Sequence, residues 1–368
     1  MQKFGRLGLG GVAVLLAACG GKGVSSVGHV HGGAGGATAG AAGSGGSDVG
    51  RAGGGSPGGD AEGCLGCELV VAAANVLQFA ANARAVYWIQ RGTNNEFEEY
   101  NGDGALMARD LDSGQVSTLA SGLLRPDYFG VSARYAYVFV SNDGNPVLRR
   151  YPLDSVGATA GEDVAPYYSS SDFPLERPAF AATQDFSYFR IRKQLHRIAD
   201  APDAKETLVE FDGQRDIGSI VADDKRLHFW GDLFGASGLY TVNGPGVAPT
   251  RLSDLSWDYL SVVDGYFYAS ENPYFSRLPA TGGTWKRFAD VDNAFAHTGL
   301  QVLGDYFYTV EERNDVNRAV IQRGALSAPK DRTDVVSYPH VTGPVSWLVT
   351  RTGVYWATDS GVYFKPSP

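Results

Sequence analysis

The chain of 368 residues lacks the motifs that identify common enzymes. No GxSxG, HExxH or Walker loop occurs in it, so serine hydrolase, zincin and P-loop activities have no support. Long stretches of helical periodicity are also missing, and the one apolar run near the start is too short to span a bilayer. The pattern therefore favours β-structure and leaves the activity open.

Cysteine is scarce, with three residues at positions 19, 64 and 67. Cys64 and Cys67 enclose two residues, and in an oxidising compartment such a pair is expected to form a structural disulfide. A redox-active pair and a zinc site are the alternatives. The first would need a βαβ setting and the second would need two further ligands, and the surrounding sequence supplies neither.

Positive charge is in deficit, with 31 Lys and Arg against 40 Asp and Glu. An acidic surface argues against a nucleic-acid partner. It also means that contact with a membrane would come from lipid and not from a basic patch.

The first residues have the form of a targeting segment. Lys3 and Arg6 precede an apolar run over residues 7–18, which fits the core of a secretory signal. The run ends Leu-Ala-Ala before Cys19 and Gly20, which resembles the lipobox of bacterial lipoproteins. The resemblance implies cleavage before Cys19, acyl chains of the palmitate type on that residue, and firm anchoring by several chains. An ordinary signal peptide is the alternative.

The resemblance also bears on location. Position 20 is Gly and not Asp, so the signal that retains enterobacterial lipoproteins in the inner membrane is missing. We therefore expect a lipid-anchored protein of the cell envelope, in the outer membrane, with its domain facing the periplasm or the cell surface.

Glycine divides the chain into three parts. Residues 20–63 hold 19 glycines among 44 residues, a composition that cannot bury enough surface to fold. A coil of that length spans roughly 35–40 Å. The expected organisation is a signal peptide over 1–18, a flexible tether over 19–67 and one folded domain over 68–368.

The folded part is rich in aromatic residues and repetitive. Residues 68–368 carry 42 of the 43 aromatic residues, and a unit of an apolar strand, a turn and a second strand with an aromatic pair recurs seven times. Repeats of roughly 40–50 residues with several short strands each predict a β-propeller. Seven units predict seven blades, with six or eight blades as alternatives. A spare strand over 68–73 would pair into the short last blade and close the ring. The pairs begin at Tyr87, Tyr137, Tyr188, His228, Phe267, Phe307 and Tyr355.

The repeat unit resembles the YWTD-like and TolB-like propeller repeats of bacterial secreted proteins. The nearest local match is the run Tyr-Trp-Ala-Thr-Asp over residues 355–359. The resemblance implies a fold and not an activity, because propellers serve as binding modules, lyases, glycosidases and lactonases alike.

A site is expected where the loops enter the innermost strands, around the mouth of the central channel. This rim would combine charges of both signs with aromatic surface. Its candidate residues are Arg125, Asp127, Glu176, Arg177, Arg215, Asp216, Trp257, Asp258, His297 and His340.

Two functions from different classes fit this rim. The first is a binding or scaffold module for a protein, peptide or glycan. The second is a hydrolase or lyase that uses the carboxylates of the rim as an acid/base pair, with or without a divalent metal. No cofactor is expected. Residues 101–104 and 142–145 resemble fragments of Ca²⁺ loops, but hairpin turns use the same residue types, and turns are the favoured interpretation.

Overall fold

The computed structural model describes most of the predicted domain. Cys19 and the predicted signal and tether segments up to residue 63 lie outside the described residues. The described residues are 64, 66–73, 75–93, 102–126, 128–142, 145–157, 160–166, 180–183, 185–191, 194–199, 205–210, 220–223, 226–233, 235–254, 259–271, 274–290, 296–313, 318–339, 346–358 and 360–367.

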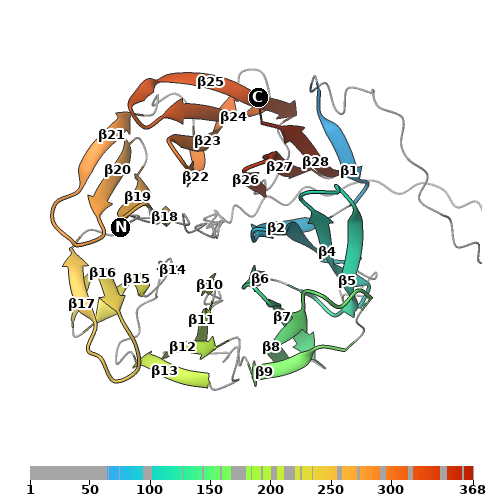
Figure 1. The fold of residues 1–368 in the computed structure, drawn as a ribbon, viewed down its shortest axis with the longest axis horizontal. Coiled ribbons are helices and arrows are strands. Elements are labelled where there is room, and N and C mark those ends of the chain that lie inside the picture. Colours follow the sequence, from blue (N-terminus) through green and yellow to red (C-terminus); the bar gives the residue numbers. More distant parts are fainter. Residues whose placement is uncertain are drawn as a thin grey trace, which may run out of the picture.

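These residues form seven antiparallel sheets of four strands each, and no helix occurs among them. The first six sheets each use four consecutive strands, and Figure 1 shows all seven arranged around a common centre. The strands of blades 1 to 6 are β2–β5 (Val76–Ala81, Ala85–Gln90, Gly104–Asp110, Val116–Leu123), β6–β9 (Tyr128–Val131, Tyr135–Asn142, Asn145–Pro152, Glu162–Pro166), β10–β13 (Phe180–Ala182, Phe186–Ile191, Gln194–Ala199, Lys205–Glu210), β14–β17 (Ile220–Ala222, Leu227–Leu233, Ala236–Val242, Thr250–Ser253), β18–β21 (Tyr259–Val263, Tyr266–Glu271, Tyr274–Pro279, Lys286–Asp290) and β22–β25 (Ala296–Leu303, Tyr306–Arg313, Arg318–Ala325, Ala328–Pro339).

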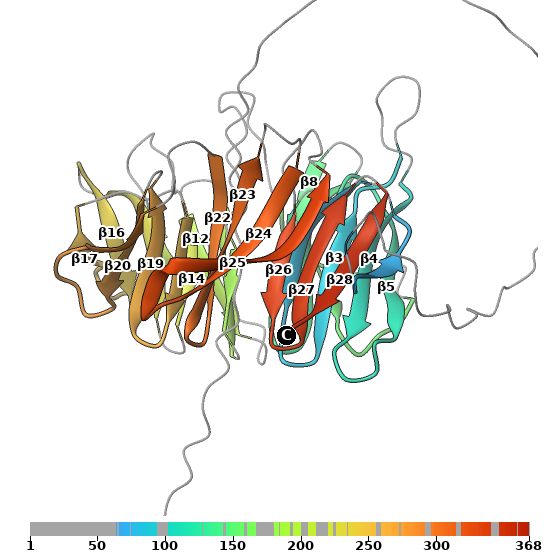
Figure 2. The ribbon, with the colours of Figure 1, turned by 90° about the horizontal axis from the view of Figure 1, so that it is seen from above.

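Blade 7 joins the two ends of the domain. Its order is β1-β28-β27-β26, so β1 (Glu68–Val71) pairs with β28 (Gly361–Pro366), beside β27 (Gly353–Thr358) and β26 (Trp347–Thr350). Every innermost strand contacts the innermost strand of the next blade, including β26 with β2, so the ring is closed. The blades stand side by side as a disc when seen edge-on (Figure 2). The predicted seven-bladed propeller with its closing N-terminal strand is confirmed.

Seven short hairpins join the first and second strands of the blades, and their sequences explain why they form. In five blades a polar side chain at the start of the turn accepts backbone N–H bonds, as Asn82 does from Arg84 and Ala85. Blade 5 uses Asp264-Gly265 instead, both with positive φ (49° and 75°), which suits a two-residue hairpin. The residues at the start of the five polar turns are Asn82, Ser132, Thr183, Asp223 and Thr350.

Large side chains fill the spaces between blades. Phe275, Phe288 and Phe307 pack between blades 5 and 6, with ring centroids 5.5–6.2 Å apart, and Phe307 meets the other two rings edge to face. Gln301 of β22 links blade 6 to blade 7 because its amide donates to the Trp347 carbonyl and accepts from Val349 N–H. Aromatic rings thus join blades 5 and 6, while the cluster between blades 1 and 2 is mostly aliphatic.

The closing blade is held by two further contacts. Cys64 and Cys67 are bonded in a disulfide, with Cα atoms 5.5 Å apart, and both are buried in the cluster between blades 6 and 7. Arg109 of blade 1 donates to the Glu68 carboxylate at 2.8 Å and stacks on Phe364 at 4.6 Å. Blade 7 is therefore tied to both of its neighbours.

Candidate functional site

The channel rim predicted from the sequence falls mostly outside the part of the chain that the structure describes. Arg125 is described, in the link between β5 and β6 with a φ of 44°, and the backbone of His297 lies in β22. The rim and the carboxylate mechanism attached to it stay predictions. The rim candidates outside the described residues are Asp127, Glu176, Arg177, Arg215, Asp216, Trp257, Asp258 and His340.

One of the two Ca²⁺-like segments is partly described. Asp103 accepts hydrogen bonds from the backbone N–H and hydroxyl of Thr93 at 2.8 and 2.7 Å, which braces the loop between β3 and β4. These bonds lower the pKa of the Asp103 carboxyl. In the other segment Asn142 pairs with Asn145 across a hairpin, as a turn requires, while residues 143 and 144 lie outside the description.

The hairpin register defines one equivalent position on the second strand of every blade. It lies six residues after the last paired residue of the first strand in blades 1 to 4 and five residues after it in blades 5 to 7, where the turn is shorter, and we call it the ring position. In blades 5 and 6 it is one residue later than the start of the aromatic pair read from the sequence, because the pattern alone does not locate the turn. The ring residues are Tyr87, Tyr137, Tyr188, His228, Tyr268, Tyr308 and Tyr355.

An arginine of the third strand lies opposite the ring tyrosine in four blades. Its guanidinium also lies over the aromatic ring two residues before that tyrosine, a cation–π arrangement. The distances from guanidinium carbon to ring centroid are 4.5 Å for Arg150 over Tyr135, 4.5 Å for Arg197 over Phe186, 5.4 Å for Arg277 over Tyr266 and 4.9 Å for Arg323 over Tyr306.

The fourth strand decides whether these arginines are neutralised. In blades 2 and 3 it places a glutamate opposite, and Arg150–Glu162 and Arg197–Glu206 are ion pairs of 2.7 and 2.6 Å. In blade 5 the residue opposite Arg277 is Lys286. In blade 6 the residue opposite Arg323 is Thr333.

Blades 5 and 6 therefore carry uncompensated positive charge in a protein that is acidic overall. Among the described residues neither Arg277 nor Arg323 forms an ion pair. The tyrosines beneath them, Tyr266 and Tyr306, are 39% and 41% exposed. These four residues and Lys365 of blade 7 are called the cationic face below.

A cavity of about 350 Å³ opens between blades 6 and 7 at one end of this face. Arg323 and Lys365 supply positive charge to its wall, and the turn of the disulfide contributes Gly66. The remaining lining residues are Thr333, Asp334, Val335 and Pro366.

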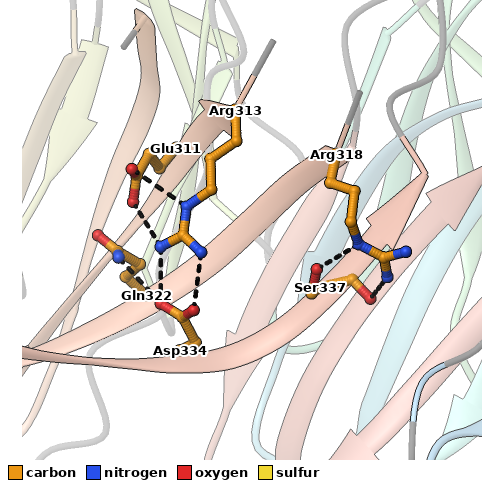
Figure 3. A network of polar contacts seen from close by, with 6 residues as sticks. All are labelled: Glu311, Arg313, Arg318, Gln322, Asp334 and Ser337. Carbon is orange, nitrogen blue, oxygen red and sulfur yellow. Dashed lines mark hydrogen bonds and ion pairs between the residues drawn. The ribbon is translucent and has the colours of Figure 1, made fainter. Parts of the chain in front are cut away.

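Asp334, the acidic residue of the cavity wall, is already engaged. Arg313 donates to its carboxylate at 3.0 and 3.1 Å and also to that of Glu311, and Gln322 donates to it at 3.0 Å (Figure 3). Burial would raise the pKa of the Asp334 carboxyl, but the bonds from Gln322 and Arg313 outweigh burial and lower it. Asp334 therefore stays ionised at neutral pH and shares Arg313 with Glu311. Arg323 and Lys365 are the cations of the cavity wall that form no ion pair among the described residues.

Blade 4 departs from the ring of tyrosines. Its ring residue His228 is fully buried, with Nε2 3.0 Å from the Asp223 carboxylate that also binds Arg226. Burial lowers the pKa of His228 despite the neighbouring carboxylate. The imidazole is therefore neutral near pH 7, and its role here is to fill a place in the core.

The cationic face escaped the sequence prediction, although a signal for it exists. An aromatic residue two positions before the ring tyrosine, followed by an arginine on the next strand, recurs in blades 2, 3, 5 and 6. Only the register of the fourth strand shows which of those arginines lack a glutamate.

Comparison with known proteins agrees on the fold. No protein-family model matches the sequence, and no curated protein matches it either. Among solved structures, a chain from a study of two prolyl endopeptidases matches with a TM-score of 0.52 and 12% identity, over 81% of this chain and 50% of that chain. The extracellular domain of a hybrid two-component system from B. thetaiotaomicron matches with a TM-score of 0.50 and 13% identity, over 80% of this chain and 38% of that chain.

A third match is TolB from Acinetobacter baumannii, with a TM-score of 0.43, 12% identity and coverage of 67% of this chain and 62% of that chain. This chain spans 50% of the length of the endopeptidase chain and 38% of the length of the two-component chain. The first two matches, with TM-scores of 0.52 and 0.50, show a shared propeller fold, and at these identities they carry no activity over to this protein. No helix among the described residues is long and apolar enough to cross a membrane.

Proposed function

We propose that this protein is a lipid-anchored binding module of the bacterial cell envelope, which holds a protein, peptide or glycan partner through the cationic face. The observation that carries the proposal is the pair of exposed tyrosines in neighbouring blades, each beneath an arginine without a carboxylate. Tyrosine and arginine, with tryptophan, are enriched among the residues that dominate binding energy.

The comparison between blades supports this interpretation. Blades 2 and 3 satisfy the same arginine with a glutamate, so the fold accommodates that arrangement without difficulty. Where the glutamate is missing, the guanidinium lies over a ring and bonds the hydroxyl of the ring tyrosine, Tyr268 or Tyr308, and its remaining N–H groups are offered to a partner. Because stacking already orders the side chain, a partner would lose little entropy by binding it.

The proposal is tested with the purified full chain, immobilised and exposed to envelope extract and to a glycan array. We expect a Tyr266→Ser/Tyr306→Ser variant to retain at least tenfold less of the partner that the native chain captures, measured by quantitative mass spectrometry or array signal. The control is Val156→Ser/Val247→Ser, which removes two exposed apolar side chains elsewhere. Equal capture by all three proteins would refute a role for this face.

The anchor is tested separately. If acyl chains on Cys19 hold the protein to the membrane, Cys19→Ser should move it from the membrane fraction into the soluble fraction. The matched control, Cys64→Ser/Cys67→Ser, removes the other two cysteines and should leave the protein in the membrane fraction. A Cys19→Ser protein that sediments with membranes would overturn the lipoprotein assignment.

A further inference from the structure

We propose that the cavity between blades 6 and 7 binds the carboxylate side chain of an acidic peptide segment, which lies extended along β25. This inference rests on the proposed function and names the class of partner. It draws on the charge of the cavity wall, on the free edge of β25 and on a break in the ladder of that strand.

The charge of the wall selects an anion. Arg323 and Lys365 both line the cavity, and neither forms an ion pair with any described residue, while Asp334 is bound by Arg313, which it shares with Glu311. The hydroxyl of Thr333 lies on the same wall and bonds only weakly, at 3.5 Å, to the Arg323 carbonyl. A carboxylate would thus meet two cations and a hydroxyl donor, whereas a cationic group would be repelled.

The edge of β25 selects an extended peptide. β25 runs for 12 residues over Ala328–Pro339 and is the outermost strand of its blade, and no strand among the described residues pairs with its outer side. Such an edge offers backbone N–H and C=O groups to an added strand. A glycan has no matching ladder of backbone donors and acceptors, so the edge favours a peptide.

The ladder between β24 and β25 breaks at the cavity. Ile321 pairs with Val336 and Gln322 pairs with Asp334, which leaves Val335 as an extra residue without a partner on β24. A bulge between the third and fourth strands recurs in blades 1 to 6 and is part of the repeat, and a bulge of this kind bends its strand. Here it lies in the cavity wall, so the strand that would receive the peptide curves where the carboxylate would enter.

The experiment uses the purified full chain and a fluorescein-labelled decapeptide of alternating Glu and Thr, followed by fluorescence anisotropy. Alternation places every glutamate on one face of an extended strand. We expect binding that weakens with added salt and falls at least tenfold when Gln replaces Glu. N-methylation of alternate backbone nitrogens should weaken it as well, because the peptide would then lack ladder donors.

Three variants locate the site. Lys365→Met should weaken binding, and Arg323→Met/Lys365→Met should weaken it at least tenfold. The control Arg84→Met/Lys205→Met removes the same charge from exposed positions of blades 1 and 3 and should leave affinity within about twofold. Arg323 stacks on Tyr306, so thermal denaturation must show that the Arg323→Met/Lys365→Met variant is folded. If it is not folded, Lys365→Met alone tests the site, because the Lys365 side chain forms no ion pair with a described residue.

The outcomes separate this inference from the proposed function. Equal losses in the cavity and control variants would mean general attraction of charge and would overturn the cavity site. If oligogalacturonate bound in place of the peptide, and the cavity variants weakened that binding, the partner would be an acidic glycan and the proposal of an acidic peptide would be wrong. If the peptide fails while the Tyr266→Ser/Tyr306→Ser variant still loses its partner, the inference falls and the binding function stands.

Discussion

Replacing Trp356 with alanine should lower the free energy of unfolding by about 3–5 kcal/mol, the usual cost of removing a fully buried indole. Trp356 is 1% exposed and stacks between Tyr338 and Tyr363, with centroids 6.1 and 5.6 Å away. These rings come from blade 6 and from β28, so the indole joins the closing blade to its neighbour. Urea denaturation followed by circular dichroism measures the change.

Two controls make this prediction specific. Trp356→Phe keeps a ring in place and removes an indole N–H that has no acceptor among the described residues, so it should cost much less than the alanine variant. Tyr306→Ala removes a ring that is 41% exposed and should cost about 1 kcal/mol or less, while it should impair binding. A Trp356→Ala protein as stable as Tyr306→Ala would show that the interface does not depend on this ring.

The inner strands of the propeller could be predicted from the sequence because they are buried on both sides of the blade. The second strand of blade 7 is buried at every residue, and its sequence is correspondingly apolar and aromatic. The closing strand could be predicted as well, since β1 is the one strand before the first unit and β28 ends the chain one strand short. The burial of the inner strands and the number of strands in the first and last units are therefore enough to predict the closed ring.

Some outer strands escaped the prediction for the opposite reason. β13 reads Lys-Glu-Thr-Leu-Val-Glu, and its first and last residues are exposed, so half of it faces solvent and little apolar pattern remains. β9 and β25 are likewise rich in charged residues. These strands form because the third strand offers them a hydrogen-bonding edge, which is a tertiary cause that propensity does not report.

The candidate site is harder to foresee than the fold, because it depends on a comparison between blades. Arg277 and Arg323 look like Arg150 and Arg197 in the sequence, and all four precede a further strand. Whether that strand delivers a glutamate to the arginine depends on bulges in its register, as at Leu195/His196 in blade 3. A one-residue shift reverses the face of every following side chain, so composition alone cannot identify the uncompensated arginines.

Acid should destabilise the propeller between about pH 6.5 and pH 4 through a buried histidine. His196 is 4% exposed, and burial, with a smaller contribution from Lys205, lowers its pKa to about 4. Below pH 6.5 the unfolded chain binds a proton that the folded imidazole refuses, so stability falls with pH and stops falling near pH 4. The shift is worth about 2 kcal/mol after allowance for solvent screening. His228, whose pKa is also lowered, adds to the loss.

Urea denaturation at a series of pH values from 7 to 4 measures this slope. His196→Asn keeps a polar group near the Thr207 hydroxyl, which lies 3.3 Å from Nδ1, but it cannot titrate, so it should remove about 2 kcal/mol of the pH dependence. His228→Asn should remove a further part. The carboxyls of Asp103, Asp110 and Asp334 have lowered pKa values and begin to lose their contribution near pH 5, but they do so equally in the native chain and in the histidine variants, so the difference in slope reports the histidines. If the free energy of unfolding of the His196→Asn/His228→Asn double variant depends on pH as steeply as that of the native chain, the buried imidazoles take up protons in the folded protein as readily as in the unfolded one.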